Sequence, residues 1–439
     1  MDLLQFFAWL NNDILALPAT ILFFGIGIVL TVKYGFLQIR AFPLFIKLLA
    51  KGATKGKHQA GEGQMRTIGS IGALFTAMAT TIGIGNIVSP TLAIMVGGPG
   101  ALFWLIVYIF IGSAIKFTEV VFALDTRIKT VDGHIIGGPM RYLAQVQPWL
   151  AVWYGLAMAL LMAGWSGVQA NTLASILAHE HVPAWVTGLG LGLFVWVVLR
   201  GGAQRVSAVA SKLVPIMFIG YVSFAAIILL KDLSALGQAF TLIFQGAFSP
   251  VAAAGGLVSV TLFQTMRTGV YRGIFITESG IGTSSIPHAM ADVEKPTDQG
   301  ILAMFSAGAD AFLSLVSGLL VLVTGIWMQG EFRSTLVYEV FKMHSPVFGR
   351  WILTGSIALF ALTTVMGNSF NGRQSFAALA GFRWVNAYLL FTVSLIFLGS
   401  MMRVQLVWEM MDTVLTFVAI PNLIGVVYLA FKRPNVLKV

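Results

Sequence analysis

Two glycines and an asparagine interrupt an otherwise apolar stretch of this chain, and together they could hold a ligand. The run 79–87 contains Gly83 and Gly85, two positions apart, followed directly by Asn86. Each glycine weakens a helix by about 1 kcal/mol. The helix N-terminus that a break exposes suits a carboxylate, and freed carbonyl groups suit Na⁺. We therefore expect Thr81, Gly83, Gly85 and Asn86 to contribute to a binding site.

A second glycine pair lies in a later apolar stretch, where the run 249–256 ends in Gly255 and Gly256. Small residues are also typical of close helix packing in membranes, which is the stronger interpretation for an isolated pair. Here the two pairs lie five apolar segments apart, in segments of opposite direction. Paired breaks at matching places in inverted repeats indicate a transporter site. We therefore expect Gly255 and Gly256 to face the same substrate.

Ionisable residues inside apolar segments are the other candidates for chemistry. Asp310 stands alone between two alanines and is the candidate proton site if the coupling ion is H⁺. Glu278 follows Arg272, and we expect it to act in an inner gate, as a proton site or in a structural ion pair. Lys116 and Glu119 lie three residues apart, where a self-satisfying pair is the simplest interpretation. No nucleophile–base pair or metal cluster is visible, so we expect no enzyme activity.

The composition places these residues in a membrane protein. Of the 439 residues, 57% are apolar and only 10% are charged, against roughly 25% charged in an average soluble domain. The mean hydropathy is +0.87. A soluble protein with this composition would have too little polar surface to cover itself. The composition therefore excludes a soluble enzyme, a disordered chain and a nucleic-acid module. Cysteine is absent, which excludes disulfide bonds and a thiol nucleophile. The N-terminal residues carry no basic stretch, so we expect no cleavable signal peptide.

Eleven apolar segments could cross a bilayer, for which a helix needs about 20 residues. They lie at 15–33, 69–96, 100–123, 149–178, 184–202, 207–230, 240–275, 298–327, 350–372, 384–401 and 404–431. The segment 15–33 would be an extra helix, and the regions 69–230 and 240–431 would form two five-helix repeats of opposite topology. We therefore expect an all-α polytopic membrane protein with a single transmembrane domain over residues 1–439.

The basic residues predict how these segments are oriented. With the loop 34–68 in the cytoplasm, 22 of the 27 lysines and arginines fall at cytoplasmic ends and 5 at outer ends. Cytoplasmic loops of membrane proteins carry such an excess of basic residues. The distribution predicts an outside N-terminus and a cytoplasmic C-terminus.

Several short runs resemble the alanine/glycine:cation symporter family, also called sodium:alanine symporters. They are YGFLQIR at 34–40, GIGNI at 83–87, GGPGALFW at 97–104, KFTE at 116–119, GGPM at 137–140, QAN at 169–171, RGIF at 272–275 with Glu278, Gly280 and Gly282, and TT at 363–364. The resemblance implies a LeuT-type fold of the amino acid–polyamine–cation superfamily: a five-plus-five inverted repeat and, here, one extra N-terminal helix. It also implies Na⁺- or H⁺-coupled uptake of a small neutral amino acid.

The resemblance further implies a sodium site between the first broken helix and the eighth helix of the core. The matching oxygens are the carbonyls of Ala79 and Ile82 and the hydroxyls of Thr363 and Thr364. Na⁺ is a small hard cation that such oxygens bind well without a full carboxylate. The alternative is that the threonine hydroxyls bond to carbonyls of their own helix, as is common in apolar helices.

By the same resemblance, Gln169, Thr364 and the position of Asn368 would contact the bound amino acid. The alternative for Gln169 is a hydrogen bond between helices. Two positions depart from the family pattern. The usual SNEAG run is ITESG at 276–280, and Asn368 stands where a tryptophan is usual. We expect a carboxamide in place of an indole to make the pocket larger and more polar. The alternatives are that Phe370 refills the space or that the family alignment is displaced by one residue. Two substrate classes therefore stay open: a small amino acid such as alanine or glycine, and a larger or polar one.

We therefore expect a secondary symporter of a bacterial or archaeal inner membrane, working by alternating access. Its partners would be a neutral amino acid, Na⁺ or H⁺, and the lipid bilayer, without nucleic acid or an obligate protein partner. A channel is the rival class, but it would need a continuous polar lining. The scattered polar residues and paired breaks favour alternating access.

The topology can be tested with reporter fusions. A reporter at the N-terminus should be active only outside the cell, and reporters in the loop 34–68 and at the C-terminus only in the cytoplasm. A cytoplasmic N-terminus would contradict the eleven-segment arrangement.

Overall fold

The computed structural model of the protein describes residues 2–54, 67–178, 180–249, 251–253, 258–329, 336–345, 348–402 and 404–439. Helices dominate these residues, and two short hairpins accompany them. The helices are α1 (Leu3–Trp9), α2 (Ala16–Lys33), α3 (Leu37–Arg40), α4 (Phe42–Thr54), α5 (Ser70–Thr81), α6 (Gly85–Gly97), α7 (Ala101–Asp125), α8 (Pro139–Tyr142), α9 (Pro148–Ala178), α10 (Ala184–Arg200), α11 (Gly202–Leu229), α12 (Leu233–Phe248), α13 (Leu262–Thr277), α14 (Ser285–His288), α15 (Pro296–Val323), α16 (Leu336–His344), α17 (Phe348–Ala380), α18 (Val385–Met401) and α19 (Val404–Lys432). The strands are β1 (Ile128–Lys129), β2 (Ile135–Ile136), β3 (Val251–Ala253) and β4 (Val258–Val260).

Eight of the described helices are long and apolar enough to cross a bilayer: α2, α7, α9, α11, α15, α17, α18 and α19. Helices α5 and α6 form a ninth span together, bent by 41° at the break between them. Helices α10 and α12 are apolar but shorter. The described helices thus support eight or nine spans, and the expected count of eleven stays a prediction. Helix α2 occupies the segment 15–33, and its place outside the two repeats stays a prediction.

Apolar side chains on the outside of the bundle indicate where lipid would lie. Leu193 of α10 and Ile216 and Ile219 of α11 are each at least 60% exposed. In water such a surface would mark an interaction site, whereas a bilayer solvates it directly. The polar side chains of the long helices instead turn inward, since hydrocarbon offers them no partner.

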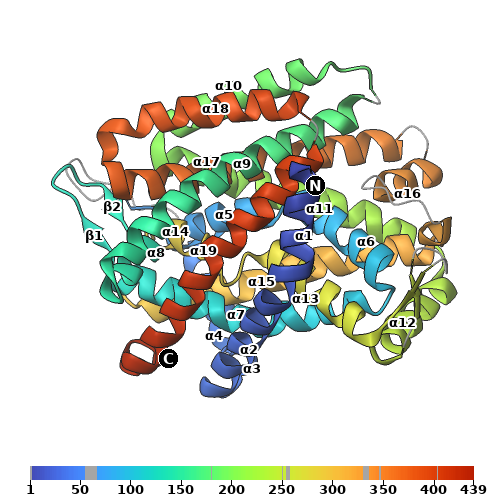
Figure 1. Ribbon diagram of the computed structural model, residues 1–439, viewed down its shortest axis with the longest axis horizontal. Helices are drawn as coiled ribbons and strands as arrows, with labels where there is room; N and C mark the ends of the chain where they lie inside the picture. Colours follow the sequence, from blue (N-terminus) through green and yellow to red (C-terminus); the bar gives the residue numbers. More distant parts are fainter. Residues whose placement is uncertain are drawn as a thin grey trace.

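The long helices pack in two groups with the broken helix between them. Helices α9, α17, α18 and α10 lie side by side in the upper half of Figure 1, and α7, α13 and α15 lie in the lower half. Helix α5 contacts α11, α17 and α15, and α6 contacts α13 and α15. The break between α5 and α6 therefore faces helices from both groups.

The break expected at 249–256 is not an unwound turn within a spanning helix. Helix α12 ends at Phe248, β3 and β4 pair antiparallel with Val251 opposite Val260, and a capping box at Thr261 begins α13. The valines of this stretch favour paired strands over a helix. Gly255 and Gly256, which we expected in the substrate site, lie outside the described residues.

A second interruption of helical structure lies further along the chain, between α13 and α14. Glu278, Gly280 and Gly282 have positive φ angles of 54°, 93° and 92° there. Glycine adopts such angles without steric cost, and the glutamate occupies the left-handed cap of α13. The segment 278–284 is therefore the break that accompanies the first one, rather than 249–256.

Candidate substrate and ion site

The first break frees a backbone carbonyl inside the bundle. Helix α5 ends at Thr81, and Ile82 is extended with φ −82° and ψ 98°. The N–H group of Gly83 would bond to the carbonyl of Ala79 in a continuous helix. It instead donates to Asn86 Oδ1 at 3.0 Å. Among the described residues no hydrogen bond reaches the Ala79 carbonyl, so this oxygen is available to a cation.

Helix α17 lies directly against this break. A Cβ atom on Gly83 would collide with Thr364 Oγ1, and one on Gly367 would come within 2.6 Å of Thr80 Cγ2. The two glycines therefore permit the close approach of the helices. The Thr364 hydroxyl is buried and has no hydrogen-bond partner in the described part of the chain. The structure thus brings one expected sodium ligand, Thr364, beside the expected carbonyls.

The neighbouring Thr363 hydroxyl has partners on its own helix. It donates toward the carbonyls of Leu359 and Phe360, each at 3.0 Å. This is the alternative arrangement that the sequence left open. A hydroxyl that donates its proton keeps lone pairs able to bind a cation, and Thr363 stays a predicted sodium ligand.

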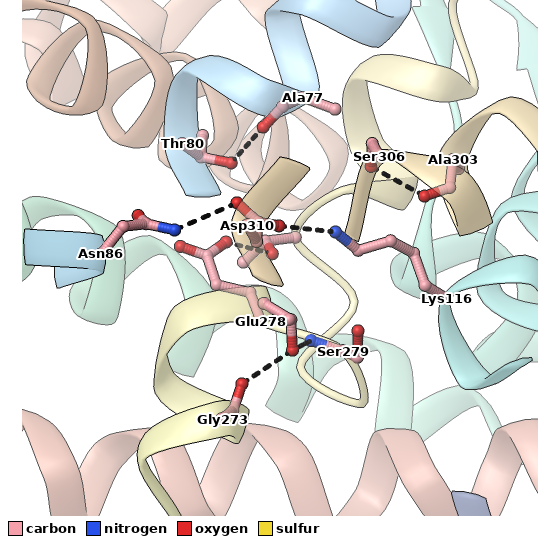
Figure 2. Close-up of polar contacts among 12 residues, drawn as sticks. Ala77, Thr80, Asn86, Lys116, Gly273, Glu278, Ser279, Ala303, Ser306 and Asp310 are labelled. Atoms are coloured by element: carbon pink, nitrogen blue, oxygen red, sulfur yellow. Dashed lines mark hydrogen bonds and ion pairs between the residues drawn. The ribbon is translucent and has the colours of Figure 1, made fainter. Parts of the chain in front are cut away.

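A buried charge cluster lies on the other side of the break (Figure 2). Asp310 Oδ1 accepts a hydrogen bond from Asn86 Nδ2 at 3.3 Å, and Asp310 Oδ2 is 3.9 Å from Lys116 Nζ. The sequence suggested that Asp310 stands alone, but in the structure it has two partners. Lys116 pairs with this aspartate of α15 rather than with Glu119 of its own helix, because α7 and α15 pack side by side.

Glu119 has partners from other helices instead. Its carboxylate accepts a hydrogen bond from Asn422 Nδ2 at 2.6 Å, and Asn422 Oδ1 accepts one from the Tyr142 hydroxyl at 2.6 Å. All three side chains are fully buried. A buried carboxylate needs such donors, since leaving it unpaired would be costly.

The second break is held differently from the first, because side chains of three helices satisfy its carbonyl groups. Tyr108 Oη donates to the Ser279 carbonyl at 2.9 Å, and Asn422 Nδ2 donates to the Gly280 carbonyl at 2.8 Å. Tyr154 Oη donates to the Ile281 carbonyl at 2.7 Å. Carbonyls that already accept a hydrogen bond are poorer ligands for a cation. At the first break, by contrast, the Ala79 carbonyl accepts no hydrogen bond among the described residues.

Glu278 is buried at the start of this second break. Its carboxylate accepts a hydrogen bond from the Thr283 hydroxyl, and it lies beside Asp310 in Figure 2. Among the described residues it forms no ion pair, with Arg272 or any other base. The expected structural ion pair is therefore not present there, and a role as a gate or proton site stays a prediction.

Two aromatic rings and two side-chain amides lie inside the bundle, on helices α9, α13 and α17. The Phe275 ring meets the Trp165 ring, with centroids 5.5 Å apart, and approaches the position that a Cβ on Gly85 would take. Gln169 lies one turn after Trp165 on α9. Gln169 Oε1 and Asn368 Oδ1 are buried and have no hydrogen-bond partner in the described residues. Buried amide oxygens usually have partners, so both can accept one from a ligand.

Comparison with known proteins identifies the group to which this site belongs. A family model described as the sodium:alanine symporter family matches residues 1–439. The chain belongs to the sodium:alanine symporter family. A sodium/alanine symporter, AgcS, of Methanococcus maripaludis is 31% identical and covers 98% of this chain and 95% of its own. A probable sodium/glutamine symporter, GlnT, of Bacillus subtilis is 28% identical, and the match covers 98% of this chain and 89% of GlnT.

Solved structures show the same fold at low sequence identity. MhsT in complex with L-phenylalanine gives a TM-score of 0.63 at 15% identity, covering 85% of this chain and 91% of its own. A Na⁺-coupled sialic acid symporter gives a TM-score of 0.55 at 12% identity, and the match covers 93% of this chain and 83% of that chain. The likeness confirms the LeuT-type fold. Membership of the sodium:alanine symporters makes the chain a multi-pass membrane protein and a cation-coupled amino acid symporter, not an enzyme.

The structure brings together most of the expected site residues of this symporter. Thr81, Gly83, Gly85 and Asn86 form the first break, with Ala79 and Ile82 beside them and Thr364 against them. In the described part of the chain no hydrogen bond links Gln169 or Asn368 to these residues.

Sequence reasoning missed the residues that hold the second break. Asn422 is an asparagine in an apolar helix of 29 residues, which is the same signal that singled out Asn86. Tyr108 and Tyr154 gave no comparable signal, because tyrosine is already enriched at the membrane–water interfaces of membrane proteins. The partner of Asp310 was missed because Lys116 has a nearer candidate in the sequence.

The hydrogen bonds to the second break should be measurable as stability. Tyr154→Phe leaves the Ile281 carbonyl without a donor, and we expect a loss of about 1–3 kcal/mol. Thermal unfolding of the purified protein in detergent should show a lower melting temperature. Tyr428→Phe is the matched control, because this tyrosine is 45% exposed. Equal melting temperatures for both variants would contradict the role of Tyr154.

Proposed function

We propose that this symporter uses an inward Na⁺ gradient to take up a small neutral amino acid, alanine or glycine, through the inner membrane. The observation that carries the proposal is the contact between Thr364 and Gly83, beside the free carbonyl of Ala79. A buried hydroxyl without a partner among the described residues, next to unwound backbone, supports a site for a hard cation. The alanine symporter among the relatives supports the substrate class.

Sodium rather than a proton is favoured by the kind of group that faces the first break. Hydroxyl and carbonyl oxygens bind a hard cation, but they do not take up a proton near neutral pH. The two carboxylates nearby already accept hydrogen bonds, Asp310 from Asn86 and Glu278 from Thr283. The amino acid would lie next to the ion, between the break and Gln169.

The coupling ion can be tested by uptake into proteoliposomes. We expect alanine to accumulate under an inward Na⁺ gradient, but not under a K⁺ gradient or a pH gradient alone. Uptake that needs only a pH gradient would contradict sodium coupling. The same assay separates a symporter from a channel, since only the symporter concentrates its substrate against a gradient.

The Thr364 hydroxyl can be tested in the same assay. Thr364→Ala removes an oxygen that nothing else in an apolar site replaces, at a cost of about 2 kcal/mol or more. We expect the half-saturating Na⁺ concentration to rise at least about tenfold. Thr364→Ser keeps the hydroxyl and should stay near the parent value. Similar values for the alanine and serine variants would show that Thr364 does not bind the ion.

Asn368 supports the second substrate class, a larger or polar neutral amino acid. It lies one turn after Thr364 on α17, and its buried Oδ1 can accept a hydrogen bond from such a side chain. A relative named as a probable sodium/glutamine symporter supports this second class.

A competition panel of glycine, alanine, serine, glutamine and leucine decides between the two classes. If Asn368 shapes the pocket, glutamine or serine should compete well in the parent, and Asn368→Trp should narrow uptake to glycine and alanine. Asn368→Gln is the control that keeps an amide. If glycine and alanine compete best in the parent, and the order of competitors is the same in the tryptophan variant, Asn368 has no part in selectivity.

A further inference from the structure

A line of polar contacts connects a buried ion pair to the first break. Lys116 Nζ is 3.9 Å from Asp310 Oδ2, Asp310 Oδ1 accepts from Asn86 Nδ2 at 3.3 Å, and Asn86 Oδ1 accepts from the Gly83 N–H at 3.0 Å. Figure 2 shows the first two contacts, made between α7, α15 and α6. The side chains of Lys116, Asp310 and Asn86 are each at most 1% exposed.

The order of these contacts fixes which way the Asn86 amide faces. An amide has one end that donates and one that accepts, whereas an ionised carboxylate only accepts. Asp310 therefore draws the NH₂ group of Asn86 toward itself and turns the amide oxygen toward Gly83. The Lys116 ammonium balances the negative charge, without which a carboxylate could not stay ionised at this depth.

The amide orientation has a consequence for the ion site. Because the Gly83 N–H is taken by Asn86, it cannot return to the Ala79 carbonyl and close the helical turn. The Ala79 carbonyl is thereby kept free for a cation. Glu278 lies next to this cluster (Figure 2), but its hydrogen bond goes to Thr283.

We propose that Asp310 and Lys116 are positioning residues that set the Na⁺ affinity through Asn86. Neither touches the ion, and Asp310 does not carry a coupling proton. The ion pair orients Asn86, Asn86 holds the Gly83 N–H, and the break stays unwound with its carbonyl directed to the ion. The inference rests on the proposed sodium coupling at the first break.

The test replaces the ion pair by apolar residues of similar size, Asp310→Leu with Lys116→Met. Removing both charges together avoids an unpaired buried ion, and such exchanges are often neutral for stability. Ser306→Ala is the matched control, because Ser306 lies one turn before Asp310 and bonds only to its own helix at Ala303 among the described residues. Two quantities are measured: the half-saturating Na⁺ concentration for alanine uptake, and the Na⁺-induced rise in melting temperature in detergent.

We expect the double variant to raise the half-saturating Na⁺ concentration about tenfold, which corresponds to ~1.4 kcal/mol. Its maximal uptake at saturating Na⁺ should change little, and the Na⁺-induced rise in melting temperature should need correspondingly more Na⁺. A merely structural role would lower the maximal uptake or the melting temperature without this shift. Ser306→Ala should resemble the parent in both measurements.

A second background tests whether the effect passes through Asn86. Asn86→Ala should itself raise the Na⁺ requirement, and adding the Asp310→Leu and Lys116→Met changes should then raise it no further. A parent-like Na⁺ requirement in the double variant would overturn the inference, as would an equal further rise in the Asn86→Ala background. If the parent itself shows no Na⁺ dependence, the proposed function fails and the inference fails with it.

Discussion

Every backbone N–H and carbonyl inside a bilayer needs a partner within the protein, and this structure depends on how two interrupted helices meet that need. At 278–284 the protein supplies the partners itself, through Tyr108, Asn422 and Tyr154. At the first break the Gly83 N–H is satisfied by Asn86, but among the described residues no donor reaches the Ala79 carbonyl. The same constraint thus produces a closed break and an open one. The open break is suited to a cation, because a cation can take the place of the missing donor.

The buried charges follow from the same constraint. Lys116 and Asp310 come from α7 and α15, and each would be costly inside the bundle without the other. Their contact joins α7 to α15, and the hydrogen bond from Asn86 to Asp310 adds α6, which belongs to the broken span. Glu119 is held separately by Asn422, which also supports the second break. The two breaks are therefore linked to two different polar networks, and the networks approach one another at Glu278, beside Asp310.

Local features of the sequence predicted the first break well, and long-range features were harder to predict. Gly83, Gly85 and Asn86 act through their own backbone and neighbours, so their effect is visible in a short run of residues. The second break was expected too early in the chain, because the glycine pair at 255–256 resembled the pair at 83 and 85. The valines around that pair, which favour strands, were not taken into account. The pairing of Lys116 with Asp310 joins residues far apart in the chain, and only the packing of α7 on α15 reveals it. The family resemblance supplied the approach of Thr364 to the break, which spacing alone does not give.

Hydrogen–deuterium exchange of the parent protein in detergent, compared in Na⁺ and in K⁺ at equal ionic strength, tests most directly whether the first break is the ion site. Backbone exchange reports local opening, which a bound ion suppresses. Peptides that cover 79–86 should exchange more slowly in Na⁺ than in K⁺, while peptides that cover 278–284 should exchange alike, because their carbonyls are already satisfied. Unchanged exchange at 79–86, or Na⁺ protection confined to 278–284, would contradict the assignment of the ion to the first break.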